Sequence, residues 1–129
     1  MNQPDAALPY LEQAADVWRV AAGPTHSRYA RALDRLANAH RQLKNLGDAR
    51  THGEMSLSIL REHYGEEHTL TADSHYTMGQ LEFDEQDFTE AERHFSTALT
   101  IRSNAFGDSH QEVWKVERQM ARVARTTRR

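Results

Sequence analysis

The sequence predicts an all-α protein in which antiparallel helix hairpins stack into a right-handed α-solenoid of about six helices. The main observation is an internal repeat: the tetrad Gly-x-x-His begins at Gly23, Gly65 and Gly107, so successive copies lie 42 residues apart. Between the tetrads, apolar residues recur at helical spacing, and no segment alternates as a strand does. One hairpin is too small to cover its own apolar face, so neighbouring hairpins stack into a continuous core.

The repeat divides residues 1–129 into parts of a single domain. We expect a lone second helix over residues 5–22, a first repeat over 26–64, a second repeat over 68–106, a lone first or capping helix over 110–125 and a frayed basic tail over 126–129. The first helix is expected to start near Leu8, with Pro9 in its first turn, where a missing N–H is harmless.

Helix boundaries inside the repeats follow from capping residues. The apolar series from Leu33 to Leu46 predicts one helix, which Gly47 ends and after which Asp48 caps the next helix. The second repeat is expected to run from Leu70 to Glu85 and from Phe88 to Phe106, with Asp87 as N-cap and Glu90 completing a capping box. The last helix begins near His110 and continues through Val123.

Small residues at fixed positions indicate a family. Leu36-Ala37, Ala49 and Ser56 in the first unit, and Met78-Gly79, Ala91, Phe95 and Ala98 in the second, lie at the spacing of the tetratricopeptide repeat. With its longer period and Gly-x-x-His tetrads, the chain resembles the kinesin-light-chain type of this repeat from about Ala7 to Ala124. It departs from the pattern at His40, Gly53 and Glu82.

The resemblance implies a non-catalytic protein-interaction module whose first helices line a concave groove. Carried over position by position, it assigns partner binding to Arg31, Arg35, Asn38, Arg41, Tyr76, Thr77, Gln80, Phe83, Lys115, Arg118, Gln119 and Arg122, with Asp34, Asp73, Asp84 and Arg125 beside them. This set holds seven basic and three acidic side chains, although the whole chain has a net charge of −3. We therefore expect a protein or peptide partner that is acidic and offers an apolar anchor to Tyr76 and Phe83.

Two alternatives to groove binding stay open at this point. Residues 62–92 carry ten acidic and no basic side chains, whereas the flanking segments are net basic, so copies could self-assemble into a homo-oligomer. The exposed ends for such pairing would include Leu11, Val17 and Val20 on one side and Val113, Trp114 and Met120 on the other. RNA binding through Arg118, Arg122, Arg125, Arg128 and Arg129 ranks third, because the acidic balance argues against nucleic acid.

A clamp for a peptide's C-terminal carboxylate, which one variant of the family has, is a weaker interpretation. Its two-Lys, two-Asn, one-Arg set is matched here by Asn38 and Lys115, but not by Asp34, Thr77 or Gln119. Trp18 and Trp114 are interpreted mainly as packing residues.

Composition and motifs exclude several other classes. No cysteine is present, so thiol catalysis and thiolate zinc sites are excluded, and a reducing, cytoplasmic location is expected. The eight histidines form no H-x-x-x-H or H-E-x-x-H pair; those of the tetrads, His26, His68 and His110, are expected to cap the following helices. No phosphate loop, nucleophile elbow, secretory signal or membrane span is found, so we expect no metal, no cofactor and no catalysis.

Overall fold

The computed structural model describes residues 4–128, which form six α-helices and, within that range, no strand. The helices are α1 (Pro4–Ala22), α2 (Ser27–Gln42), α3 (Leu46–Tyr64), α4 (Thr69–Asp84), α5 (Phe88–Phe106) and α6 (Gln111–Thr127). Residues 1–3 and 129 lie outside the described part, and with them Arg129 of the predicted RNA-binding set. The predicted all-α hairpin solenoid is confirmed.

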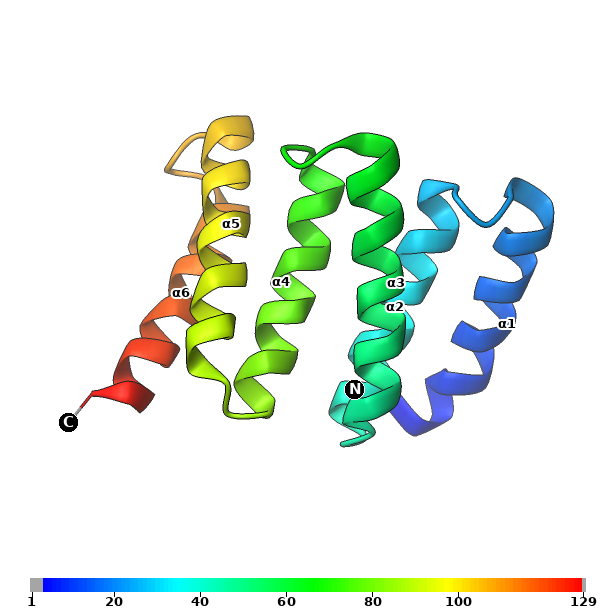
Figure 1. The fold of residues 1–129 in the computed structure, drawn as a ribbon, viewed down its shortest axis with the longest axis horizontal. Coiled ribbons are helices and arrows are strands. Elements are labelled where there is room, and N and C mark those ends of the chain that lie inside the picture. Colours follow the sequence, from blue (N-terminus) through cyan, green and yellow to red (C-terminus); the bar gives the residue numbers. More distant parts are fainter. Residues whose placement is uncertain (1–3, 129) are drawn as a thin grey trace.

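The helices form two layers, and the layers define an inner and an outer face (Figure 1). Helix α2 contacts α4, and α4 contacts α6, whereas α1, α3 and α5 make no backbone contacts with one another in the described chain. Because α2, α4 and α6 lie closer together, the stack curves toward them, and their common face is the concave one.

Each histidine of the Gly-x-x-His tetrads caps the helix that follows it. The ring Nδ1 atoms of His26, His68 and His110 accept hydrogen bonds from the backbone N–H groups of Arg28, Leu70 and Glu112 at 3.1, 3.0 and 3.1 Å. These bonds satisfy one unpaired N–H group in each first turn. The predicted capping role is thus confirmed at all three positions.

The predicted boundary between α2 and α3 was wrong. Helix α2 ends at Gln42, and the left-handed residue of the turn is Lys44, with φ of 67°, while Gly47 lies inside α3. The N-cap position is Asn45, although its side chain makes no capping hydrogen bond, and Asp48 lies in the first turn of α3. The second repeat has the same turn at Gln86, with φ of 64°.

Three smaller expectations also need correction. Helix α1 starts at Pro4, so Pro9 lies in its interior rather than in its first turn. Asp87 caps α5 through the N–H of Glu90 at 3.2 Å, as predicted, but the reciprocal bond of a capping box is missing because the Glu90 carboxylate binds Arg93. Helix α6 continues to Thr127, so the predicted fraying from residue 126 is wrong for residues 126 and 127.

Two of the positions that depart from the family pattern, Gly53 and Glu82, lie at the contact between the two repeats, whereas the third, His40, makes its contact within the first repeat. Gly53 leaves room for Met78, whose Sδ would be 2.7 Å from an added Cβ. Glu82 is buried and binds Arg50 of α3, and the ring of His40 stacks on that of His52, 5.3 Å between centroids. The unusual residues therefore have local partners that replace the usual packing.

The helices at the two ends are only partly covered. On α1, Val17 and Val20 are 56% and 75% exposed, and Trp114 on α6 is 53% exposed, whereas Val113 is 1% exposed and was wrongly expected to be bare. Leu11 and Met120 are half-buried. None of the six described helices combines the length and apolar character needed to cross a bilayer.

Candidate functional site

The concave face is built from polar side chains that join successive first helices. Thr77 on α4 donates a hydrogen bond to Asp34 Oδ2 on α2 at 3.0 Å. Arg41 donates to Asp84 Oδ2 at 2.9 Å and to Asn38 at 2.9 and 3.1 Å. Thr77 is buried and Arg41 is mostly shielded, so these two predicted contact residues join α2 to α4 in the free protein.

The predicted aromatic anchors also lie on this face, and each has an arginine against its ring. The Arg122 guanidinium lies 4.0 Å from the ring centre of Phe83, and that of Arg102 lies 5.0 Å from the ring centre of Tyr76. Both rings are half-buried against the α4–α6 core. Cation–π contacts of this kind orient the rings while leaving part of each surface available.

Arg102 is a residue that sequence reasoning missed. It comes from α5, is only 4% exposed, and binds Asp73 Oδ1 at 2.9 Å and the carbonyl of Glu112 at 3.2 Å. The signal was present in the repeat, because the equivalent positions hold Trp18 and Leu60. A charged residue at a repeat position that is otherwise apolar indicates a buried ion pair, and here Arg102 of α5 binds residues of α4 and α6.

Several predicted basic residues remain exposed. Arg31, Arg35 and Arg118 form no ion pair within residues 4–128, and Lys115 pairs only with Glu112 in its own helix, at 3.0 Å. Gln80 and Gln119 are half-buried. The structure thus leaves the cations of this face concentrated at its two ends, on α2 and α6.

A small cavity of about 110 Å³ lies between α1 and α2, next to the α2 end of this face. It is lined by Ala14, Trp18, Arg28, Arg31, Ala32 and Arg35. Arg28 stacks over the Trp18 ring, 4.9 Å from its centre, so the cavity combines one aromatic wall with three guanidinium groups. Carboxylates are the natural ligands of such groups.

Asp34 makes the middle of the face less acidic than its sequence suggests. Its Oδ1 is shielded from solvent and has no hydrogen-bond partner among the described residues. Burial, opposed by the Thr77 hydrogen bond and reinforced by Asp73, raises the pKa of Asp34 to about 7. Near neutral pH a large fraction of this carboxyl group is therefore uncharged.

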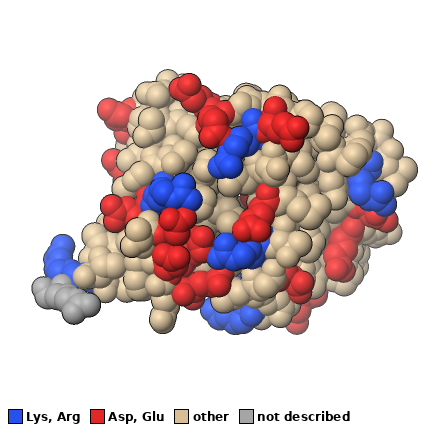
Figure 2. Space-filling model, viewed as in Figure 1, with Lys and Arg blue, Asp and Glu red and all other residues tan. Residues whose placement is uncertain are grey.

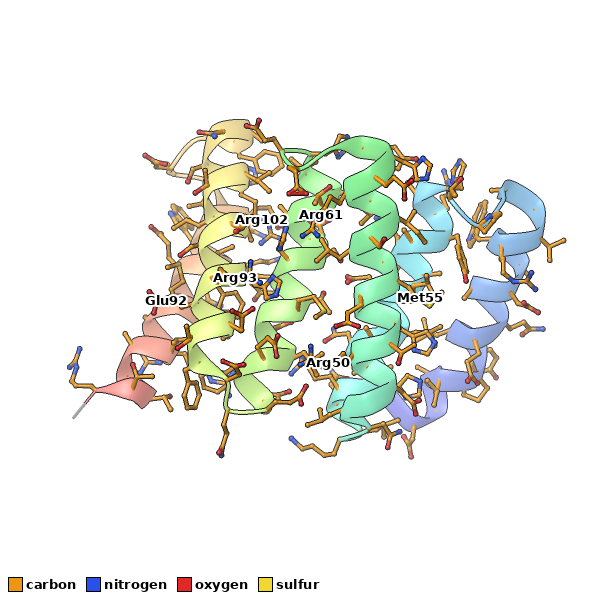
Figure 3. All side chains as sticks on the ribbon, viewed as in Figure 1. Arg50, Met55, Arg61, Glu92, Arg93 and Arg102 are labelled. Atoms are coloured by element: carbon orange, nitrogen blue, oxygen red, sulfur yellow. The ribbon has the colours of Figure 1, made fainter. Side chains whose placement is uncertain are left out.

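The opposite face carries charges of both signs that are mostly paired. Basic and acidic side chains are intermixed over the middle of the face that α3 and α5 present (Figure 2). Arg50, Arg61 and Arg93 line a cavity of about 340 Å³ there, and each binds a glutamate (Figure 3). The Arg50 guanidinium alone binds Glu54, Glu82 and Glu85. The hydrogen bonds and charges of Glu82 and Glu85 raise the pKa of Arg50 further above its usual value, against the opposing effect of burial.

Two buried histidines lie behind this cavity. His75 Nδ1 and His94 Nδ1 are 3.0 Å apart, so one ring donates to the other. Burial first, and then the neighbouring His94, Arg61 and Arg93, lower the pKa of His75 to about 4. Burial, with Arg93, also lowers the pKa of His94, and the pair is therefore neutral at physiological pH.

One group of potential metal ligands lies beside this histidine pair in the described part of the chain. Donor atoms of Glu82, Glu90 and His94 lie within 4.8 Å of one another. Both carboxylates, however, are bound by arginines: Glu82 by Arg50 and Glu90 by Arg93. A cation would have to displace these arginines, so the group supports no metal assignment.

The stacked hairpins and their open concave face define a helical-repeat scaffold. A model of the tetratricopeptide repeat family matches residues 1–62 and 30–104. These overlapping matches cover most of the sequence, and the chain belongs to the tetratricopeptide repeat family. Repeats of this family generally mediate protein–protein interactions.

Curated relatives are much longer than this chain. Three proteins called clustered mitochondria protein homolog, from Coccidioides immitis, Aspergillus clavatus and Neosartorya fischeri, are each 26% identical over 111 or 112 residues. The matches cover 86 to 87% of this chain and 8 to 9% of the relatives. The chain thus spans less than a tenth of the length of the curated relatives it matches.

A solved structure shows the same fold. The crystal structure of BtubC (BKLC) from P. vanneervenii superposes with a TM-score of 0.82 at 19% identity, covering 95% of this chain and 49% of that one. Together with the family match, this similarity confirms the predicted repeat family and the predicted hairpin solenoid.

Proposed function

We propose that the protein is a non-catalytic interaction module that binds an acidic peptide segment of a partner protein along the α2–α4–α6 face. The observation that carries this proposal is the set of unpaired arginines: Arg31 and Arg35 beside Trp18 at one end, and Arg118 at the other. Between them, Phe83 and Tyr76 offer half-buried aromatic surface for an apolar side chain. Arginines and aromatic residues are enriched among residues that dominate binding energy.

The electrostatic balance of the face supports an acidic ligand. Arg41 is compensated by Asp84, and Arg102 by Asp73. Because the pKa of Asp34 is raised to about 7, this carboxyl group is only about half ionised at neutral pH, which reduces its negative charge. The cations left without a partner therefore dominate the potential of the face, and such a potential steers an acidic segment toward it.

A non-catalytic role and a cytoplasmic location belong to the same proposal. The most strongly shifted groups outside the concave face, His75 and Arg50, lie in packed or ion-paired surroundings rather than at a substrate-sized apolar pocket. The lack of cysteine suits a reducing compartment.

Charge reversal on the concave face tests this function. The probe is a fluorescein-labelled peptide with Glu residues on both sides of a central Leu, and its affinity is measured by anisotropy at low salt. We expect the double variant Arg35→Glu, Arg118→Glu to bind it at least about tenfold more weakly, because two cations become anions facing the ligand. The circular dichroism spectrum should stay that of the wild type, since both side chains are exposed.

The matched control reverses two arginines on the other face. Arg61→Glu with Arg93→Glu changes the net charge by the same amount, but these residues lie on α3 and α5 (Figure 3). We expect this control to bind within about threefold of the wild type, since only long-range potential is altered. Equal losses in the two double variants, or no loss in either, would contradict the proposal.

A further inference from the structure

One edge of the solenoid, made by α1 and α2, is uncovered in the described structure and combines exposed apolar side chains of α1 with arginines of α2. Tyr10 and Val17 on α1 are 73% and 56% exposed. The residues 84 positions further along, His94 and Ile101 on α5, are only 5% and 4% exposed because a first helix packs on either side of α5. Figure 1 shows α1 at one end of the stack, with α2 as its neighbour.

The α2 part of this edge is basic. The internal repeat shows which way its side chains face: Thr77 on α4 contacts Asp34 of the preceding first helix, α2. Arg35 is the residue 42 positions before Thr77, so it faces the place where a first helix preceding α2 would lie. Arg28, Arg31 and Arg35 line one cavity there and form no ion pair within residues 4–128.

We propose that this edge docks an acidic amphipathic helix from a partner protein, which packs on α1 and α2 in the place of a preceding first helix. Its apolar stripe would cover Tyr10 and Val17, and its carboxylates would pair with Arg31 and Arg35. This inference shares Arg31 and Arg35 with the proposed groove but adds Tyr10 and Val17 of α1, so a variant of Tyr10 distinguishes its failure from a failure of the groove function.

The two complete hairpins predict part of the partner's sequence. Across each hairpin a first helix and a second helix meet at a small residue: Gly79 against Phe95, and Ala37, 3.7 Å from the Cβ position of Gly53. Leu11 is the residue of α1 equivalent to Gly53 and Phe95, so the docking helix needs a small residue opposite Leu11. Three residues earlier, at the position of Asp34, a carboxylate would face Arg35.

A second copy of this chain is a poor occupant of the same edge. Helix α6 is the first helix with no second helix after it in the described chain, so it would be the part that docks. Its residue equivalent to Asp34, however, is Arg118, which would lie opposite Arg35. Arg122 and Arg125 follow on the same helix, and this like-charge contact disfavours head-to-tail self-assembly.

Two peptides that differ only in charge test the proposal. The probe is residues 27–42 as a stapled helix in which Arg28, Arg31 and Arg35 are replaced by Glu; it keeps Asp34 and, three residues later, Ala37. The control peptide keeps the arginines. We expect the full chain to bind the acidic peptide at least about tenfold more tightly than the control peptide, with a loss of affinity as salt is raised. Equal binding of the two peptides, or no binding of the acidic one, would overturn the proposal.

Protein variants separate this edge from the concave groove. Tyr10→Glu should weaken binding of the acidic helix at least about tenfold and leave the affinity for the groove peptide unchanged. Arg118→Glu should weaken binding of the groove peptide and leave the affinity for the acidic helix unchanged. Loss of the acidic helix in Arg118→Glu would place it in the groove and overturn the edge assignment. Ala121 of α6 is the residue equivalent to Ala37 and Gly79, so Ala121→Arg would block docking of a second copy. Concentration-dependent self-association of the wild type that Ala121→Arg abolishes in sedimentation velocity would also overturn the assignment, because the occupant would then be a second copy.

Discussion

Single residues at equivalent repeat positions perform different tasks in this protein. Trp18, Leu60 and Arg102 occupy one position of the repeat. Leu60 is buried in the core, and Trp18 packs against the α1–α2 core with Arg28 over its ring. Arg102 instead links α4, α5 and α6 through Asp73 and Glu112. The histidines of the tetrads, in contrast, keep one task in all three copies. The repeat therefore predicts where the backbone of a residue lies, whereas the role of its side chain depends on the residues that surround it in each copy.

Asp34 gives a pH-dependent prediction at this scale. Its pKa is about 7 in the folded protein and about 3.9 in an unfolded chain, so the folded state holds the proton more tightly. Its contribution to the free energy of unfolding therefore falls as pH rises from about 4 to 7. We expect Asp34→Asn to stabilise the protein more at pH 8 than at pH 5, by roughly 2–3 kcal/mol, because it removes a shielded charge that forms in the folded protein between these pH values.

Urea unfolding of both proteins at pH 5 and pH 8 provides the measurement. Other titrating groups, the buried histidine pair included, are common to both proteins and cancel in the difference. Asp16→Asn is the matched control, since Asp16 is 69% exposed and should shift stability by less than about 0.5 kcal/mol at either pH. A destabilised Asp34→Asn at pH 8 would show that the charged form is the favoured one.

At the scale of helices, close approach depends on two glycines. A Cβ on Gly79 would lie 2.5 Å from Phe95 Cε1, and Phe95 is fully buried, so α4 and α5 approach each other through a missing side chain. A Cβ on Gly53 would meet the flexible end of Met78 instead. Gly47, in the first turn of α3, has open space around it.

A series of alanine substitutions checks this order. Gly79→Ala should destabilise by about 1–3 kcal/mol, because the clash with Phe95 outweighs the gain in helix propensity. Gly53→Ala should cost less, because Met78 can change rotamer. Gly47→Ala should stabilise by up to ~1 kcal/mol through helix propensity alone. Thermal unfolding of the three variants gives the ranking, and a Gly79→Ala variant as stable as Gly47→Ala would contradict the packing described here.

The helices were largely predictable from the sequence, and the exception has a clear cause. Between α2 and α3, Leu43 and Leu46 continue the apolar spacing of α2 across the turn, and Gly47 suggests a stop that the chain does not use. The 42-residue repeat predicts the correct start of α3, because Asp87 is the N-cap of α5 and Asn45, the N-cap of α3, lies 42 residues before it.

The concave face was predictable as a set of positions but not as a charge distribution. First-helix residues could be placed on it from the repeat, since helical spacing fixes the direction of a side chain. The ion pairs Arg41–Asp84 and Arg102–Asp73 join residues 43 and 29 positions apart, so they depend on how the helices stack. The raised pKa of Asp34 likewise depends on burial between α2 and α4.

For the whole molecule, the two layers have different properties. The inner layer of α2, α4 and α6 leaves cations unpaired at its ends, whereas most charges over the middle of the α3–α5 face are compensated. Because the stack curves toward the inner layer, the exposed side chains of α2, α4 and α6 lie along one concave surface, and an extended ligand can contact all three helices at once. The central claim is that this inner face, rather than the outer one, binds the partner.

Amide chemical-shift perturbation with the acidic Glu–Leu–Glu peptide tests this claim most directly. Normalised to the fraction of protein that is bound, the amide shift changes should be largest on α2, α4 and α6, and greatest near Arg35, Phe83 and Arg118. They should diminish when Arg35→Glu and Arg118→Glu are introduced together. Perturbations concentrated on α3 and α5, around Arg50, Arg61 and Arg93, would contradict the account.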